Sequence, residues 1–364
     1  MEYTIRDKNL LWLDCFDFMT YSKKTALLKA YGQDVDLREK LSKEMIPALQ
    51  DILSKEELAK LNACKDEDFL NLKLKSYQDK GIVVITIYST QYPALLREID
   101  NPPYVLYCKG NLDLLSTRCI AVVGTRRPSD YGKVVTKNYA KELAQAGLTI
   151  VSGLAHGVDT IAHEEAIAVG GKTIAVLAGG FDHIYPTSNF GLSETIAKEH
   201  LLVCENRPEV APMNYMFPIR NRILAGLSEA VLITEAQENS GSLHTKNYAV
   251  DYGRDLYVVP GKITSLESKG CNKILKEMQG SITLDPSDIL EEMKIIKQEN
   301  TGKDNFQLDF NESNILRYTM SEKKSYQDLM DYTGLAPQQL NAILLSLQIR
   351  GLIEKLPGNF YLSN

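Results

Sequence analysis

The chain lacks any apolar run that approaches the roughly 20 residues needed to span a bilayer. Its first ten residues, MEYTIRDKNL, do not resemble a secretory signal peptide. It has six cysteines, but no Cys-x-x-Cys pair is present among them, so we expect free thiols in a reducing compartment rather than a disulfide framework. Together these absences predict a cytoplasmic protein without a membrane partner.

The sequence also lacks an excess of positive charge, since 41 lysines and arginines face 47 aspartates and glutamates and the net charge is −6. Because no field of one sign covers the whole protein, a site for anions has to be a local patch. The length of 364 residues and a hydrophobic content of 44% allow two or three domains with substantial buried cores.

Three common motifs are missing as well. The sequence contains no GxGxxG, no GxxxxGK[ST] and no HExxH. These absences exclude the usual dinucleotide fingerprint, the P-loop and the zinc-protease helix. We expect neither a cofactor nor a bound metal.

What the sequence does contain is a change of pattern along the chain. Residues 1–65 place apolar residues at helical spacing and predict a small helical domain. From residue 75 to 294, short apolar runs bounded by glycine alternate with helical patterns, which is typical of a parallel sheet with helices on both faces. After apolar runs at 82–88 and 104–108, we expect strands at 119–123, 148–152, 173–178, 201–204, 230–234, 256–259 and 281–284. We expect helices near 130–146, 158–169, 189–199, 218–227, 242–253, 271–279 and 286–294.

The last part of the chain reads differently. Residues 295–312 are polar without a sustained period and predict a linker. Residues 313–364 predict three helices and a terminal hairpin, the outline of a winged-helix domain. The third of these helices, 337–349, contains no lysine or arginine, whereas a helix that reads a DNA groove normally has a basic face. We therefore favour partner binding over weak tethering of duplex DNA for this domain.

The segment from Cys119 to Gly157 organises the central domain. It predicts a strand, a glycine turn, a helix and a second strand. A helix that follows a glycine turn presents backbone N–H groups to an anion. We therefore expect an anion at the start of the helix that follows Gly124.

Four turns follow predicted strands and should meet where the carboxyl ends of those strands lie. They are residues 124–127, 152–157, 217–224 and 234–246, and they offer cations, hydroxyls and backbone donors but no evident nucleophile–base pair. This inventory favours holding phosphates over breaking bonds. The candidate phosphate-binding residues are Gly124, Thr125, Arg126, Arg127, Ser152, Gly153, His156, Arg220, Asn221, Arg222, Ser240, Gly241, Ser242, Thr245 and Lys246.

Each turn also has a simpler interpretation. The arginines at 126 and 127 could instead be solvated at the surface, and Ser240-Gly241-Ser242 could be an ordinary helix cap, but phosphate binding is favoured for both turns. Asp159 and His163 are four residues apart and could form an acid–base or metal pair, but a cap at Asp159 is the favoured interpretation. The aromatic residues Tyr185, Tyr215 and Phe217 are candidate stacking partners for bases.

Six segments together resemble the DNA-processing protein A family, DprA, also called Smf. They are AVVGTRRPSDYG (121–132), VSGLAHGVDTIAH (151–163), GGKTIAVLAGGFDHIYP (170–186), FPIRNRILAGLSEAVLITEA (217–236), SGSLHTKNYAVDYGRDLYVVPG (240–261) and SKGCNKIL (268–275). The resemblance implies an extended Rossmann-like domain that binds single-stranded DNA and forms a homodimer. It also implies protection of incoming DNA and loading of RecA onto it during natural transformation, without an established enzymatic activity. The N-terminal helices look like a SAM-like module, and the winged helix like a module of longer members.

The resemblance assigns phosphate contacts to Arg126, the Ser152–Gly153 turn, Arg220, Arg222 and the stretch from Ser240 to Lys246. Two other functions are left open. One is a nucleotide-processing enzyme on the same fold, like the phosphoribohydrolases, although their Gly-Gly-x-Gly-Thr turn with its following glutamate is absent here. The other is a scaffold whose pocket has lost its ligand.

Overall fold

The computed structural model describes residues 3–43, 52–295, 309–320 and 322–363. The chain divides into two compact units, Met1–Lys297 and Gln298–Asn364. Most of the predicted linker at 295–312 lies outside the described residues. The described helices of this chain include none that is both long and apolar enough to cross a membrane.

The first unit begins with helices whose starts are set by hydroxyl caps. Thr4 and Ser54 each accept the backbone N–H of the third helical residue, and the acidic residue there bonds back to the cap. Trp12, Leu27 and Leu61 are buried together between these helices. Helix α5 extends the helical region beyond residue 65, because Leu70, Leu74 and Tyr77 keep a helical spacing toward the same core. The helices are α1 (Ile5–Asp14), α2 (Tyr21–Tyr31), α3 (Leu37–Lys43), α4 (Lys55–Ala63) and α5 (Glu67–Asp79).

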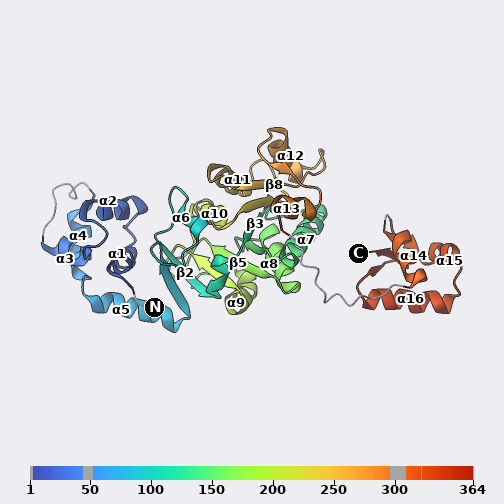
Figure 1. Ribbon diagram of the computed structural model, residues 1–364, viewed down its shortest axis with the longest axis horizontal. Coiled ribbons are helices and arrows are strands. Elements are labelled where there is room, and N and C mark those ends of the chain that lie inside the picture. Colours follow the sequence, from blue (N-terminus) through green and yellow to red (C-terminus); the bar gives the residue numbers. More distant parts are fainter. Residues whose placement is uncertain (1–2, 44–51, 296–308, 321, 364) are drawn as a thin grey trace. The chain divides into compact units, whose positions relative to one another are not determined.

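The described residues then form a nine-stranded sheet in the order β1-β2-β6-β5-β4-β3-β7-β8-β9 (Figure 1). The strands from β6 to β9 in this order are parallel, which confirms the predicted α/β class. The strands are β1 (Ile82–Thr86), β2 (Val105–Gly110), β3 (Cys119–Val123), β4 (Thr149–Ser152), β5 (Lys172–Leu177), β6 (Leu201–Cys204), β7 (Ala230–Ile233), β8 (Asp255–Val258) and β9 (Ser281–Ile282).

At one edge the sheet departs from the parallel arrangement. Strand β1 pairs antiparallel with β2, and β2 pairs antiparallel with β6. A parallel crossover needs a long connection, usually a helix. Between β1 and β2 stands only the four-residue helix α6 (Ala94–Arg97), flanked by Pro93, Pro102 and Pro103.

Helices cover both faces of the sheet. Alternate residues of β3 divide between two cores, since Ile120 and Val122 pack with α7 and α8, and Ala121 and Val123 pack with α10 and α11. The helices are α7 (Asp130–Gln145), α8 (Val158–Ala168), α9 (Phe190–Glu199), α10 (Met216–Leu227), α11 (Ser242–Asp251), α12 (Lys269–Lys276) and α13 (Pro286–Glu292). All six cysteines are free.

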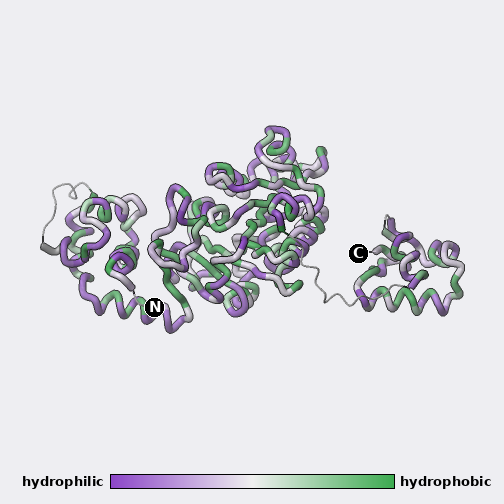
Figure 2. Tube along the Cα trace, in the orientation of Figure 1, coloured by the Kyte–Doolittle hydropathy of each residue, from purple (hydrophilic) through white to green (hydrophobic). Residues whose placement is uncertain are grey.

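The second unit contains three described helices around a core that includes Ile315, Leu329 and Leu344. Its strands form an antiparallel sheet in the order β10-β12-β11. Figure 2 shows hydrophobic and hydrophilic residues alternating along α16. Helix α14 begins at Phe310, inside the predicted linker, and β10 was not predicted; the winged-helix assignment stays a prediction. The elements are α14 (Phe310–Thr319), β10 (Lys324–Ser325), α15 (Tyr326–Thr333), α16 (Pro337–Ile349), β11 (Ile353–Leu356) and β12 (Phe360–Ser363).

Candidate functional site

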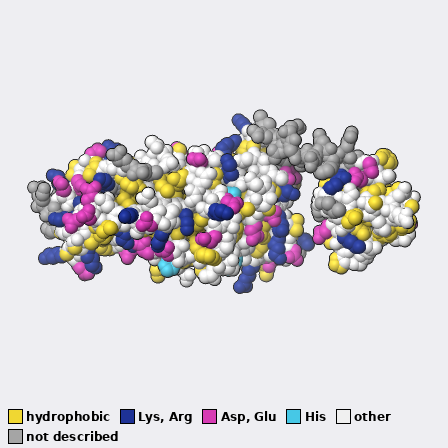
Figure 3. Space-filling view, turned by 90° about the horizontal axis from the view of Figure 1, so that it is seen from below, with side chains coloured by type: hydrophobic (Ala, Val, Ile, Leu, Met, Phe, Trp, Pro, Cys, Tyr) yellow, Lys and Arg dark blue, Asp and Glu magenta, His cyan; other side chains and the backbone are white. Residues whose placement is uncertain are grey.

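The predicted turns come together in an opening of about 450 Å³ beyond the carboxyl ends of the parallel strands. We call it the carboxyl-edge pocket. Nine of the candidate residues line it: Gly124, Thr125, Arg126, Arg220, Asn221, Ser240, Gly241, Ser242 and Thr245. On the face of the molecule that Figure 3 shows, basic and acidic side chains are interspersed, so charge of one sign does not cover that face.

The first turn, residues 124–127, packs closely against the loop after β7 and the start of α8, and this packing positions Arg126 at the pocket. The Thr125 N–H donates to Glu235 O at 2.8 Å, and Thr125 O accepts the Val158 N–H at 3.2 Å. A Cβ atom on Gly124 would lie 2.6 Å from a methyl group of Val158, so this packing requires glycine. Arg126 itself is exposed, and its guanidinium carbon lies 5.3 Å from the centre of the Phe217 ring.

The predicted anion at the start of α7 proves to be a residue of the protein itself. Glu235 is 1% exposed, and its carboxylate accepts the Ser129 N–H at 2.8 Å and the Ser129 hydroxyl at 2.6 Å. Gly132 leaves room for it, since a Cβ there would lie 2.2 Å from Glu235 Oε2. The expectation of an external anion at this helix is therefore corrected. The sequence shows only that Glu235 follows β7, not where its side chain points.

Arg220 lies at the floor of the pocket. It is buried, and its Nη1 donates to Gly153 O at 2.7 Å and also to Val176 O. Burial lowers the pKa of Arg220 to about 10, while nearby Asp159 opposes that shift. Arg220 therefore stays charged at neutral pH. A side chain at Gly153 would overlap the guanidinium, which lies against this glycine.

Asp159 and His163 do not form the acid–base or metal pair that was considered. The Asp159 carboxylate accepts the N–H groups of Gly153 and Ala155 at 3.0 and 3.3 Å, which fixes the turn before α8. His163 is fully buried, its Nδ1 lies 2.6 Å from Thr173 Oγ1, and burial lowers its pKa to about 3. Within the described residues, no group of three His, Cys, Asp or Glu side chains could hold a metal ion.

The fourth turn leaves the start of α11 without a side-chain cap. The Ser240 hydroxyl lies 2.8 Å from the Ser242 hydroxyl and accepts only a long bond of 3.4 Å from the Ser242 N–H. Thr245 is fully buried, and among the described residues its hydroxyl has no hydrogen-bond partner. The next two N–H groups are paired, since that of Leu243 donates to Ser240 O at 3.0 Å and that of His244 to Gly241 O at 3.2 Å. The weakly bonded Ser242 N–H and the unpaired hydroxyl are the groups here that suit an anion.

Six candidates do not line the pocket. Arg222 binds Glu205 at 2.6 Å and Asn101 O at 2.7 Å, because residues two apart on a helix face different directions. Lys246 donates to Gln279, and the Ser152 hydroxyl donates to Val122 O. Gly153 packs against the guanidinium of Arg220 but does not line the pocket. Arg127 and His156 are exposed and do not line it either.

One wall of the pocket is aromatic. Tyr185 and Phe217 meet edge to face with ring centres 5.5 Å apart, and both line the opening. Tyr185 and Tyr215 are each more than half exposed. The sequence-based candidates did not include Asn214, Gln237 and His244, which also line the opening. Gln237 and His244 lie inside the turn 234–246 that the sequence had identified, whereas Asn214 carries no sequence signal of its own.

Comparison with known proteins gives consistent matches. Residues 83–294 match the sequence model of a family described as DNA recombination-mediator protein A. The chain is 44% identical over 221 residues to the DNA processing protein DprA of Bacillus subtilis, covering 60% of this chain and 74% of that protein. It is 34% identical over 281 residues to the protein Smf of Escherichia coli, covering 74% of each.

Two solved structures are also similar. The X-ray structure of DprA from Streptococcus pneumoniae matches with a TM-score of 0.66 and 33% identity, covering 80% of this chain and 99% of that one. A structure of DNA processing protein A from Helicobacter pylori, described for its single-stranded DNA binding mode, matches with a TM-score of 0.54 and 34% identity. That match covers 58% of this chain and 95% of the other.

Proposed function

Since this chain belongs to the DNA recombination-mediator protein A family, which includes proteins named DprA and Smf, we propose that it binds single-stranded DNA in the carboxyl-edge pocket. The proposal extends to a role in DNA processing during natural transformation. The similar protein from Helicobacter pylori is described as having a single-stranded DNA binding mode, which supports the choice of ligand.

The start of α11 supports this proposal most strongly. It places the hydroxyls of Ser240 and Ser242, and a Ser242 N–H that makes only a long bond, beside the opening that Arg126 and Arg220 line. Thr245 lines the same opening, and its buried hydroxyl has no partner among the described residues. A DNA phosphate has the charge and the acceptor oxygens to satisfy all of these donors. Binding through phosphates is sensitive to salt and insensitive to base sequence.

The aromatic wall suits the bases of the same strand. Every base has a face that stacks on an aromatic ring, so Tyr185 and Phe217 can hold bases without selecting a sequence. A duplex keeps its bases stacked on one another and cannot use these rings. The wall therefore favours single strands over duplex DNA.

We propose further that the protein protects incoming DNA, loads RecA onto it, forms a homodimer through its Rossmann-like domain and acts in the cytoplasm without catalysing a reaction. Arg126 and Arg220 are the arginines among the described lining residues, and no lysine is among them. So few cations per protomer favour binding by dimers or longer assemblies along a strand.

Fluorescence anisotropy of a labelled oligo-dT tests the proposal. The wild type and Arg126→Ala are titrated at several salt concentrations beside a duplex of the same length. We expect the wild type to bind the single strand tightly, with an affinity that falls with salt, and to bind the duplex more weakly. For Arg126→Ala we expect a lower affinity for the single strand and a salt slope reduced by about 1. Equal binding by Arg126→Ala would move the DNA site away from this pocket.

A further inference from the structure

The two rings of the aromatic wall lie in or next to two irregular segments: Tyr185 is within residues 178–186, and Phe217, in the first turn of α10, follows residues 205–215. Residues 205–215 connect β6 to α10 and lead to Asn214 and Phe217. Residues 178–186 follow β5 and end near Tyr185. Neither segment has a strand or helix of its own, so other contacts have to fix its position.

The two segments bond to each other and form one body. The Gly180 N–H donates to Val210 O at 2.8 Å, and the Asp182 N–H donates to Pro208 O at 2.9 Å. The Asn206 side chain adds a bond of 2.7 Å to Ala178 O. A shift of one segment therefore moves the other, and with them Tyr185 and the start of α10, where Phe217 lies.

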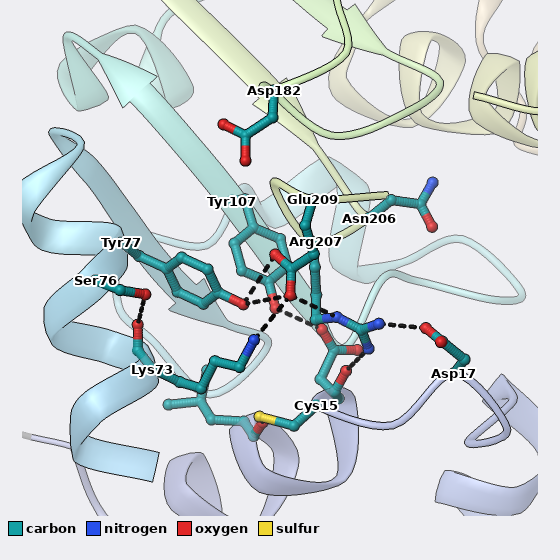
Figure 4. Close-up of polar contacts among 12 residues, drawn as sticks. Cys15, Asp17, Lys73, Ser76, Tyr77, Tyr107, Asp182, Asn206, Arg207 and Glu209 are labelled. Atoms are coloured by element: carbon teal, nitrogen blue, oxygen red, sulfur yellow. Dashed lines mark hydrogen bonds and ion pairs between the residues drawn. The ribbon is translucent and has the colours of Figure 1, made fainter. Parts of the chain in front are cut away.

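This body is fastened to the N-terminal helices through charged side chains (Figure 4). Arg207 is 11% exposed; its Nη1 donates to Asp14 O at 2.6 Å, and its Nη2 bonds to Asp17 just after α1. Its Nε lies 3.4 Å from Glu209. Arg207 thus joins the end of α1 to the segment that leads into α10.

Helix α5 supplies the second attachment. Lys73 binds Glu209 at 3.0 Å, the Tyr77 hydroxyl lies 3.4 Å from the same carboxylate, and Lys80 binds Asp182 at 2.7 Å. Residues spaced by four and three positions share one face of a helix. The face of α5 that carries Lys73 and Tyr77, with Lys80 at the C-cap just past its end, therefore holds both segments.

We propose that the N-terminal helices hold the aromatic wall in the geometry that stacking on bases requires, with Arg207 as the main positioning residue. This inference rests on the proposed binding of single-stranded DNA. None of Arg207, Glu209, Lys73 and Tyr77 lines the carboxyl-edge pocket, so their effect on DNA acts through Tyr185 and Phe217.

The test compares Arg207→Gln with Arg118→Gln. Arg118 is a matched control, because it also pairs with a glutamate, Glu229 at 2.6 Å, and donates to a backbone carbonyl, Met293 O at 3.0 Å. It precedes β3 and so lies at the opposite end of the strands from the pocket. Both variants remove one positive charge.

The readouts are the affinity for an oligo-dT that carries one 2-aminopurine, its salt slope, and the quenching of the 2-aminopurine on binding. For Arg207→Gln we expect about tenfold weaker binding, reduced quenching because the base stacks poorly, and an unchanged salt slope because no phosphate contact is lost. Arg118→Gln should behave as the wild type. Emission of Trp12, the single tryptophan of the chain, reports whether the N-terminal helices stay folded.

Lys73→Gln provides a second variant that should fold even if Arg207→Gln does not, since the Lys73 side chain is 38% exposed. We expect the affinity of Lys73→Gln for oligo-dT to be two- to threefold lower than that of the wild type. The control Lys60→Gln, which breaks an exposed pair with Glu56, should leave the affinity unchanged. Two outcomes overturn the inference while leaving the proposed function standing. One is wild-type binding by both Arg207→Gln and Lys73→Gln, with Arg126→Ala still impaired. The other is a reduced salt slope in Arg207→Gln, because Arg207 would then contact phosphate itself. Absence of binding by the wild type refutes the proposed function instead.

Discussion

The hydroxyl of Thr245 separates a role in binding from a role in folding. It is buried and unpaired among the described residues, and a buried hydroxyl without a partner costs stability. Valine has nearly the same shape but no hydroxyl. If a DNA phosphate is the missing partner, the hydroxyl stabilises the complex and not the free protein.

We therefore predict that Thr245→Val keeps or raises the free energy of unfolding, by up to about 1 kcal/mol, and weakens oligo-dT binding about fivefold. Urea unfolding and anisotropy on the same preparation measure the two effects. Lower stability with unchanged DNA affinity would show that the hydroxyl serves the fold.

His163 predicts a pH dependence of stability. Burial lowers its pKa to about 3 in the folded chain, against 6.5 for an ordinary imidazole, so the unfolded chain binds more protons between these values. The free energy of unfolding should therefore fall as the pH falls through this window, by about 2 kcal/mol between pH 7.5 and 5. His163→Gln should remove this part of the slope, and His156→Gln, at an exposed position, should not. An unchanged slope in His163→Gln would contradict the assignment.

At the residue scale, the sequence predicted which residues reach the pocket better than it predicted the hydrogen-bond and ion-pair partners of individual side chains. Arg126 and Thr245 lie in the pocket as expected, because a turn after a parallel strand has one possible edge to occupy. Arg222 binds Glu205 instead, and Glu235 accepts hydrogen bonds from Ser129, the residue that caps α7. Both depend on contacts between distant segments, which one sequence does not reveal.

At the scale of elements, α7 shows how a neighbouring turn shapes a helix. The buried Glu235 occupies the space beside Gly132. In an open helix, alanine is favoured over glycine by roughly 0.5–1 kcal/mol. Here an added Cβ would overlap a buried carboxylate, so the usual preference should reverse.

We predict that Gly132→Ala lowers the free energy of unfolding by about 2 kcal/mol. The control is Gly191→Ala in α9, where an added Cβ meets nothing within 4 Å and the free energy of unfolding should not fall. In a Glu235→Ala background the cost of Gly132→Ala should disappear, which a double-mutant cycle by urea unfolding measures. An equal cost in both backgrounds would mean that Glu235 is not the obstacle.

Elements were the most predictable level of the structure. The strands of the central sheet and the helices from α7 to α13 begin and end within a few residues of the predicted ranges, because apolar runs bounded by glycine are strong local signals. The antiparallel edge of β1 and β2 was missed, since pairing direction depends on the connection rather than on the strand itself.

At the scale of the whole molecule, the division of the chain makes a prediction about truncation. Every residue that lines the carboxyl-edge pocket lies between Val123 and Thr245, within the unit Met1–Lys297. A chain of residues 1–297 should bind oligo-dT within about twofold of the full chain by anisotropy. A loss of tenfold or more would assign part of the single-strand site to residues 298–364.

Ultraviolet crosslinking of oligo-dT to the full chain, with the attached peptides identified by mass spectrometry, tests the central claim most directly. Thymine crosslinks to the residues that it contacts, so the map requires no substitution. We predict crosslinks in the peptides that contain Tyr185 and Phe217, lost when unlabelled oligo-dT competes. Crosslinks confined to residues 310–363 or to the helices before β1 would contradict the placement of single-stranded DNA in the carboxyl-edge pocket.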